Sequence, residues 1–379
     1  MWYENTLTDL RKEKGKAIAQ LEGQVKRLND HFYEVKSQSN GGYYEVLSTE
    51  IGWLCSCPDH IYRGVKCKHI YAVEFSFALR EEVRVTRIEP LTNTSICFFC
   101  GSSNIVKVGI RHNKHDDIQK LYCKECRRYF TFNIGFEKMK HNLQAITTAI
   151  QLYFNGESLR NTQKSLRLLG VNVSHQTIYN WIKKYIILMQ KYVEKLKPQV
   201  SDTWRADELW VKIKGDMKYV FALMDDETRY WIAQEVADTK EKHDARRLFQ
   251  SGREVAGKRP MTLITDGLHA YHDAFKKEFF TLKNPRSRHI NTIRLKGDMN
   301  NNRMERFNGE VRDREKVMRG LKKNDTPILT GYQLFHNYIR PHEGLNGKTP
   351  AEACGIEVKG NNKWITLIQN ARVSTKELH

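Results

Sequence analysis

The sequence of 379 residues predicts a multidomain α+β protein. Three observations lead to this fold class. Cysteines cluster twice in the first third of the chain, at spacings typical of metal ligands. Residues from about 142 to 191 carry apolar side chains at helical spacing, with turns between them. From residue 203 onward, three strand-like runs precede alternating strands and helices, which predicts a mixed five-stranded sheet flanked by helices.

The composition favours a nucleic acid as the partner. A formal net charge of +19 attracts polyanions, either nucleic acids or anionic membranes. The chain shows no apolar run of ~18 residues and no signal peptide, so we expect a cytoplasmic protein without membrane contact. The alternative is a basic protein that binds nothing in particular.

The eight cysteines indicate metal sites instead of disulfides, because the chain shows no export signal. Seven of them lie between Cys55 and Cys126. Cys354 stands alone, and we expect it to be a small buried hydrophobic residue.

The first cysteine cluster predicts a zinc-binding module over residues 1–90. A charged helix is expected over about residues 1–30, followed by a hairpin with strands near residues 32–35 and 43–47. Three thiolates and an imidazole suit a structural, tetrahedral Zn²⁺. His60 is an alternative ligand, and a cluster of free thiols is the alternative to a metal site. The four expected ligands are Cys55, Cys57, Cys67 and His69.

This module resembles the SWIM zinc-binding domain. The resemblance is carried by the hairpin and by the segments Cys57-Pro58-Asp59 and Cys67-Lys68-His69-Ile70. It implies binding to DNA or to protein.

The second cluster predicts a zinc ribbon over residues 91–137. Two CxxC pairs separated by 22 residues of strand character are a strong signal for a structural Zn²⁺. Cations and aromatic residues in this segment suit phosphate contact and stacking, although a zinc ion that only stabilises the fold is the alternative. The expected ligands are Cys97, Cys100, Cys123 and Cys126.

A helix-turn-helix domain is predicted over residues 138–198. Ser158 and Ser174 can cap its second and third helices, and the pair at 158–185 resembles a helix-turn-helix. A plain helical linker is the alternative. Side chains at the start of the third helix are expected to contact DNA, namely His175, Gln176, Thr177, Asn180 and Lys183.

Three acids are the candidate catalytic residues of a domain predicted over residues 199–325. Asp207 lies in a strand, Asp266 closes a short apolar strand, and Glu305 lies in the first turns of a long charged helix. Clustered carboxylates bind Mg²⁺ or Mn²⁺, which promote phosphoryl transfer. The order of elements is that of an RNase H-like fold, and a C-terminal helical tail is predicted over residues 326–379.

Neighbouring acids have simpler interpretations. Glu208 is expected to face away from Asp207, because side chains alternate along a strand. Asp225 and Asp226 are expected in a turn that ends a strand, and Asp244 on the solvated face of a helix. Glu310 is the alternative to Glu305.

The segment from about 200 to 355 resembles the DDE transposase and retroviral-type integrase catalytic domain of bacterial and archaeal insertion sequences. The gap of 38 residues between Asp266 and Glu305 is longer than this family usually has. The motifs that carry the resemblance are Trp204-Arg205-Ala206-Asp207-Glu208, Thr265-Asp266-Gly267, Asn301-Asn302-Arg303-Met304-Glu305-Arg306 and Asn337-Tyr338-Ile339-Arg340-Pro341-His342.

The resemblance implies a divalent-metal-dependent transposase that cleaves the ends of an insertion sequence and joins them to target DNA. It implies a nucleoid-associated prokaryotic protein, working as a homodimer or higher oligomer on double-stranded DNA. Asp207, Asp266 and Glu305 would hold the catalytic metal, and the basic helix with Arg312 and Arg319 would contact DNA. The alternatives are a non-enzymatic, zinc-dependent DNA-binding regulator derived from a transposase and a nuclease that cuts without joining.

Overall fold

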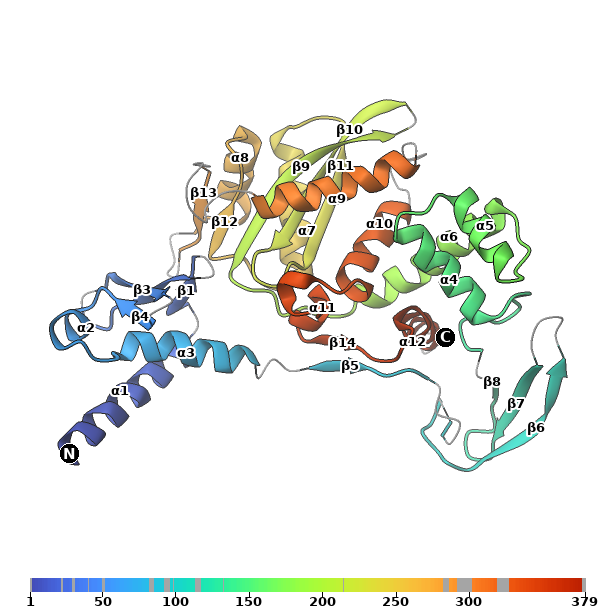
Figure 1. Ribbon diagram of the computed structural model, residues 1–379, viewed down its shortest axis with the longest axis horizontal. Helices are drawn as coiled ribbons and strands as arrows, with labels where there is room; N and C mark the ends of the chain where they lie inside the picture. Colours follow the sequence, from blue (N-terminus) through green and yellow to red (C-terminus); the bar gives the residue numbers. More distant parts are fainter. Residues whose placement is uncertain are drawn as a thin grey trace. The chain divides into compact units, whose positions relative to one another are not determined.

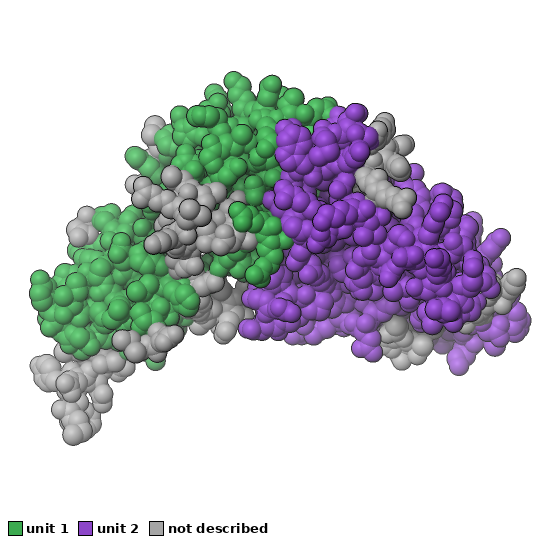
Figure 2. Space-filling view, turned by 45° about the horizontal axis from the view of Figure 1, so that its top comes forward, with its two compact units in different colours: residues 1–85, 199–208, 220–306 green, residues 86–198, 209–219, 307–379 purple. Residues whose placement is uncertain are grey.

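The structure is a computed structural model, shown in Figure 1. It describes residues 2–21, 23–28, 31–39, 41–49, 52–81, 85–91, 96–97, 99–112, 117–131, 133–213, 215–281, 286–291, 302–318 and 327–376. The chain divides into two compact units, coloured separately in Figure 2. The first unit comprises residues 1–85, 199–208 and 220–306, and the second comprises residues 86–198, 209–219 and 307–379.

The first unit begins with a small module around a four-stranded antiparallel sheet. The predicted hairpin is confirmed, with Val35 paired to Tyr44. Helices α1 and α3 pack so closely that a Cβ added to Gly15 would lie 2.4 Å from Cβ of Tyr71. The elements are α1 (Trp2–Gln20), β1 (Val25–Arg27), β2 (Phe32–Lys36), β3 (Tyr43–Thr49), β4 (Gly52–Cys55), α2 (Pro58–Arg63) and α3 (Lys68–Glu81).

A five-stranded sheet forms the centre of the chain, and the predicted α/β architecture is confirmed. Its strand order is β11-β10-β9-β12-β13, with β12 parallel to both of its neighbours. The strands are β9 (Thr203–Ile213), β10 (Asp216–Asp225), β11 (Trp231–Ala237), β12 (Thr262–Ile264) and β13 (Arg288–Ile290). The helices that follow them are α7 (Lys242–Ala256), α8 (His269–Glu278) and α9 (Asn302–Met318).

The core of this sheet depends on a close approach by α7. A Cβ on Gly252 would lie 2.3 Å from Cδ2 of Leu223, so any larger residue would force the buried Leu223 side chain to move. Trp204, Phe221 and Phe249 are fully buried around this contact. The sheet that carries Asp207 is therefore supported by a tightly packed apolar layer.

The second unit contains a three-stranded ribbon and a group of helices. Three helices have N-cap residues whose side chains accept a hydrogen bond from a backbone N–H group, namely Asn142, Ser158 and Ser174. The two serine caps predicted from sequence are therefore confirmed. The ribbon strands are β6 (Ile105–His112), β7 (Asp117–Cys123) and β8 (Tyr129–Thr131). The first helices of the unit are α4 (Leu143–Phe154), α5 (Leu159–Leu168) and α6 (His175–Val193).

The end of the chain packs against these helices. Phe154 stacks on Phe335 and Trp364, and Trp364 Nε1 donates to Gln151 Oε1 at 2.6 Å. Strand β14 pairs in parallel with β5, which precedes the ribbon in sequence. The elements are β5 (Thr86–Ile88), α10 (Pro327–Leu334), the π-helix η1 (Phe335–Ile339), the 3₁₀ helix η2 (Glu343–Leu345), α11 (Pro350–Ala353), β14 (Ile356–Val358) and α12 (Lys363–Lys376).

Among the residues that the structure describes, no helix combines the length and apolar character that a membrane span requires. Cys354 is fully buried, as predicted.

Candidate active site

Two acids predicted from sequence, Asp207 and Asp266, lie together in the first unit. The register explains why, because Arg205 of β9 pairs with Ile264 of β12 in a parallel ladder. Each acid lies two residues beyond this pair, so the two side chains leave neighbouring strands at the same level. Carboxylate oxygens of Asp207, Asp266 and Glu208 all lie within 4.8 Å of one another.

The position of Glu208 corrects the sequence-based expectation that it faces away from the site. The ladder between β9 and β12 ends at Arg205, so beyond that point the long Glu208 side chain can reach Asp266 past the end of β12. Its two oxygens accept from Lys240 Nζ at 2.6 Å and from Tyr271 Oη at 3.0 Å. Strand alternation fixes the direction of Cβ, but it does not limit the reach of a glutamate.

The cluster concentrates negative charge in a half-buried place. Burial, together with repulsion from Glu208 and Asp266, raises the pKa of Asp207 to about 7. Burial and Glu208 also raise the pKa of Asp266. Backbone N–H groups of Glu208 and Leu268 donate to the two aspartates at 2.9 and 3.1 Å, which partly opposes these shifts.

These side chains fit a hard divalent cation. All donor atoms are carboxylate oxygens, the ligands that Mg²⁺ and Mn²⁺ prefer. Burial is the main cause of the raised pKa of Asp207, and repulsion between the carboxylates, which a cation would reduce, adds to it. The described part of the chain places one lysine, Lys240, on this cluster, and that lysine pairs with Glu208.

Glu305 lies near this cluster without joining it. It is exposed in the first turn of α9, and its charge contributes to the raised pKa of Asp207. The alternative acid, Glu310, instead forms an ion pair with Arg340, at 2.5 and 3.2 Å. Arg312 is exposed on α9, whereas Arg319 lies outside the described residues.

Other acids have structural roles. Asp225 ends β10 and Asp226 follows it, as expected of turn residues, but both are buried. The expectation for Asp244 is wrong, because this residue is buried and accepts from Thr239 Oγ1 at 2.7 Å. Asp244 closes a capping box with Glu241 at the start of α7, a spacing that is visible in the sequence.

The first cysteine cluster gathers its four predicted ligands. His69 Nδ1 lies 3.9 Å from Sγ of both Cys55 and Cys67, close to the ~3.6 Å edge of a tetrahedron with zinc-like bond lengths. All four residues are buried, and hydrogen bonding from Cys55 lowers the pKa of Cys67 to about 4. His60 lies outside this group, with its Nδ1 at 2.8 Å from the carbonyl oxygen of Val65. The residues present fit Zn²⁺.

The second cluster is equally compact. The Sγ atoms of Cys97 and Cys126 are 3.6 Å apart, as are those of Cys100 and Cys123. Four thiolates around Zn²⁺ have S–S edges of roughly 3.8 Å, so this cluster also fits the metal.

The start of α6 presents the residues expected to contact DNA. His175, Gln176, Asn180 and Lys183 are exposed, and Gln176 Nε2 donates to Asn180 Oδ1 at 3.1 Å. Thr177 is half-buried, and its hydroxyl lies 3.0 Å from that of the capping Ser174.

Comparison with known proteins assigns the central segment. Residues 201–342 match the family described as "DDE domain". The chain is 30% identical over 135 residues to the transposase for insertion sequence-like element IS431mec of Staphylococcus aureus, which covers 35% of this chain and 58% of the relative. It is 31% identical over 144 residues to the "Insertion element ISM1 uncharacterized 48.3 kDa protein" of Methanobrevibacter smithii, covering 34% of this chain and 35% of that protein.

The chain thus spans little more than half of the staphylococcal transposases that it matches. Among solved structures, the HTLV-2 integrase catalytic core domain in complex with magnesium is 15% identical. It covers 42% of this chain and 98% of that chain, with a TM-score of 0.29. Because such a score does not establish a common fold, the comparison rests on the sequence matches. Residues 201–342 match the DDE domain family, and this segment is similar to transposases of insertion sequences.

Proposed function

We propose that this chain is a transposase that cleaves the ends of an insertion sequence and joins them to target DNA. The observation that supports the proposal most strongly is the gathering of Asp207, Glu208 and Asp266 within a segment that matches the DDE domain. Two aspartates whose pKa values are raised by burial and by a neighbouring glutamate suit catalysis better than they suit stability.

Each side chain has a role in this proposal. Asp207 and Asp266 would hold the divalent cations, Glu305 would assist them from α9, and Glu208 would set the charge of the site. Lys240 and Tyr271 hold Glu208 in place from two sides. Two divalent cations, when bound, activate an attacking oxygen and stabilise the leaving oxygen of a phosphodiester.

The remaining modules bind the DNA in this proposal. The two zinc clusters stabilise the first module and the ribbon, and α6 of the helix-turn-helix contacts the terminal repeats through His175, Gln176, Thr177, Asn180 and Lys183. Arg312 contacts the DNA backbone. Two ends must be joined in one reaction, so the protein works as a dimer or higher oligomer, in the cytoplasm of a prokaryote.

The experiment is strand transfer by the purified full chain. Duplexes covering the DNA on both sides of the gene are incubated with a supercoiled target plasmid and Mg²⁺ or Mn²⁺. Wild type is compared with Asp266→Asn and with Asp202→Asn, a matched control whose carboxylate pairs with Lys258 at 2.7 Å. Joined products from wild type and from Asp202→Asn, but not from Asp266→Asn, would support the proposal.

Two other results would contradict it. Specific binding of the flanking DNA without cleavage or joining would favour the regulator. Cleavage without joined products would favour the nuclease.

A further inference from the structure

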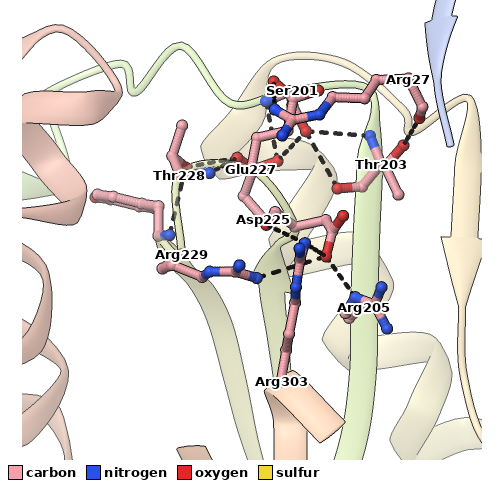
Figure 3. A network of polar contacts seen from close by, with 11 residues as sticks. Arg27, Ser201, Thr203, Arg205, Asp225, Glu227, Thr228, Arg229 and Arg303 are labelled. Atoms are coloured by element: carbon pink, nitrogen blue, oxygen red, sulfur yellow. Dashed lines mark hydrogen bonds and ion pairs between the residues drawn. The ribbon is translucent and has the colours of Figure 1, made fainter. Parts of the chain in front are cut away.

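Asp226 is the centre of a buried polar network in the first unit. Its side chain is 3% exposed and accepts from Arg205 Nε at 2.5 Å and from Arg303 Nη1 at 2.7 Å. Arg229 Nη1 lies 3.6 Å from the same oxygen. Figure 3 shows Arg303 of α9 and Arg205 of β9 reaching the connection between β10 and β11, to which Arg229 itself belongs. One carboxylate thus faces three guanidinium groups.

The arginines lie beside the proposed catalytic acids in sequence. Arg205 precedes Asp207 by two residues on β9, so the two side chains leave the same face of the strand. Arg303 precedes Glu305 by two residues in the first turn of α9. Asp226 therefore connects the strand that carries one acid to the helix that carries the other.

Two hydrogen bonds connect Asp226 to Arg303 of α9. Arg303 Nη1 reaches both Oδ1 of Asp226 at 2.7 Å and its carbonyl oxygen at 3.2 Å. Two acceptors on one residue fix both the position and the direction of the arginine. A helix is stiff over one turn, so fixing Arg303 also fixes Glu305.

Asp226 is itself held firmly. Its backbone N–H donates to the carbonyl of Thr203 at 2.9 Å. The preceding Asp225 is fully buried and accepts from Ser201 and Thr228, as Figure 3 shows. The anchor is thus part of the sheet.

We propose that Asp226 is a positioning residue that acts through Arg303 to place Glu305 beside Asp207. The inference rests on the proposed function of Glu305 and adds the means by which α9 is placed. Neither Asp226 nor Arg303 touches the DNA or the cation in this proposal.

The two residues differ in how safely they can be changed. Arg205 is 1% exposed, so Asp226→Asn would leave a buried guanidinium without its charge partner and would reduce stability. The side chain of Arg303 is 22% exposed, and Arg303→Met leaves the pair of Arg205 and Asp226 intact. Arg303→Met is therefore the informative variant. Arg303→Lys keeps the positive charge but cannot reach the carbonyl oxygen and Oδ1 of Asp226 equally well, so it tests whether the charge alone restores part of the activity.

The first unit offers a matched control. Glu278 is a second buried carboxylate with arginine partners, accepting from Arg246 Nε at 2.5 Å between α7 and α8. Arg246→Met removes the same kind of ion pair from helices that carry neither Asp207 nor Glu305.

The experiment measures the strand-transfer rate, Mn²⁺ affinity by titration calorimetry and the thermal unfolding midpoint for each full-length variant. We expect Arg303→Met to lower the rate roughly tenfold to a hundredfold, with the unfolding midpoint no lower than that of Arg246→Met. Arg303→Lys should recover part of the rate. The double variant Arg303→Met/Glu305→Gln should be no slower than Glu305→Gln alone, because both changes disable the same group.

Two results would overturn the inference. One is an Arg303→Met rate equal to that of Arg246→Met, and the other is a double variant whose loss is the product of the two single losses. A wild type without activity would count against the proposed function instead. The inference would then be decided by Mn²⁺ affinity, which Arg303→Met and Glu305→Gln should weaken equally and Arg246→Met should not.

Discussion

The pKa of Asp207 makes cation binding depend on pH in the neutral range. Without a cation, this carboxyl has a pKa of about 7, against 3.8 for an ordinary aspartate. Folding therefore raises its pKa, and the metal-free protein loses stability as pH rises from about 4 to about 7. Above pH 7 the carboxylate is free to bind a cation, whereas below it the cation must displace a proton.

The first prediction follows from the upward direction of the pKa shift of Asp207. The rise in unfolding temperature caused by Mg²⁺ should be larger at pH 8 than at pH 6, with affinity falling about tenfold per pH unit below 7. Differential scanning fluorimetry over a Mg²⁺ series at each pH measures it. Asp207→Asn should show a small rise at both values, and an equal rise for wild type at the two values would contradict the prediction.

Glu208 provides a second prediction. Its charge raises the pKa of both aspartates, so Glu208→Gln should lower the pH at which Mg²⁺ binding is half complete. Loss of one negative charge should also weaken Mg²⁺ binding about tenfold at pH 8. Calorimetric titration checks both effects, with Asp202→Asn as the control of equal charge change. An unchanged affinity would remove Glu208 from the site.

The sequence identifies some of these residues and not others. Asp207 and Asp266 are predictable, because acids at the ends of neighbouring parallel strands meet at one edge of a sheet. The place of Glu208 in the acid cluster is missed, because the alternation of side chains along a strand gives the direction of Cβ and not the reach of a long side chain. The role of Asp226 is missed because its hydrogen-bond partner Arg303 lies 77 residues away along the chain.

At the scale of elements, the modules that carry the two cysteine clusters differ in how much apolar core supports them. The first buries Val35, Val46, Ile70 and Val73 around its cysteines. The core of the ribbon is Leu121 and Phe130 with two of its own cysteines, Cys97 and Cys123. A bound metal ion would therefore contribute more to the stability of the ribbon.

The third prediction is a difference in response to a chelator. With rising EDTA, backbone amides of β6, β7 and β8 should lose protection before those of β2 and β3. Hydrogen-exchange mass spectrometry measures both modules in one sample. Chelation that leaves the ribbon protected would show that its cysteines do not hold a structural ion.

Element boundaries are well predicted where the sequence contains a recognisable helix cap or turn. Ser158 and Ser174 mark the starts of α5 and α6, and the strand-like region predicted from residue 203 begins there with β9. The pairing of β5 with β14 is not predicted, because three-residue strands carry little pattern.

At the scale of the whole molecule, each unit is assembled from distant parts of the chain. In the second unit, Phe154 of α4 is covered by Trp364 of α12, and Asn362 Nδ2 donates to Thr147 Oγ1 at 2.9 Å. The group of helices α4 to α6 thus relies on residues far beyond its own segment. In the first unit, Thr203 Oγ1 donates to the carbonyl of Arg27 at 3.0 Å, which ties the sheet to the N-terminal module.

The fourth prediction concerns a fragment of residues 1–198. Amides of α4 should exchange faster in it than in the full chain, because Trp364 and Phe335 are missing, while those of α3 should keep their protection. Adding a fragment of residues 199–379 should restore α4. Equal exchange of α4 in the fragment and the full chain would mean that the C-terminal residues do not stabilise it.

The discontinuity of the first unit also affects how the protein is made. Residues 1–85 are synthesised before residues 86–198, whose synthesis takes roughly ten seconds at common elongation rates. During that interval the N-terminal module has its own apolar core but no sheet to join. The module therefore has to fold by itself first, and the sheet is added later to a module that is already formed.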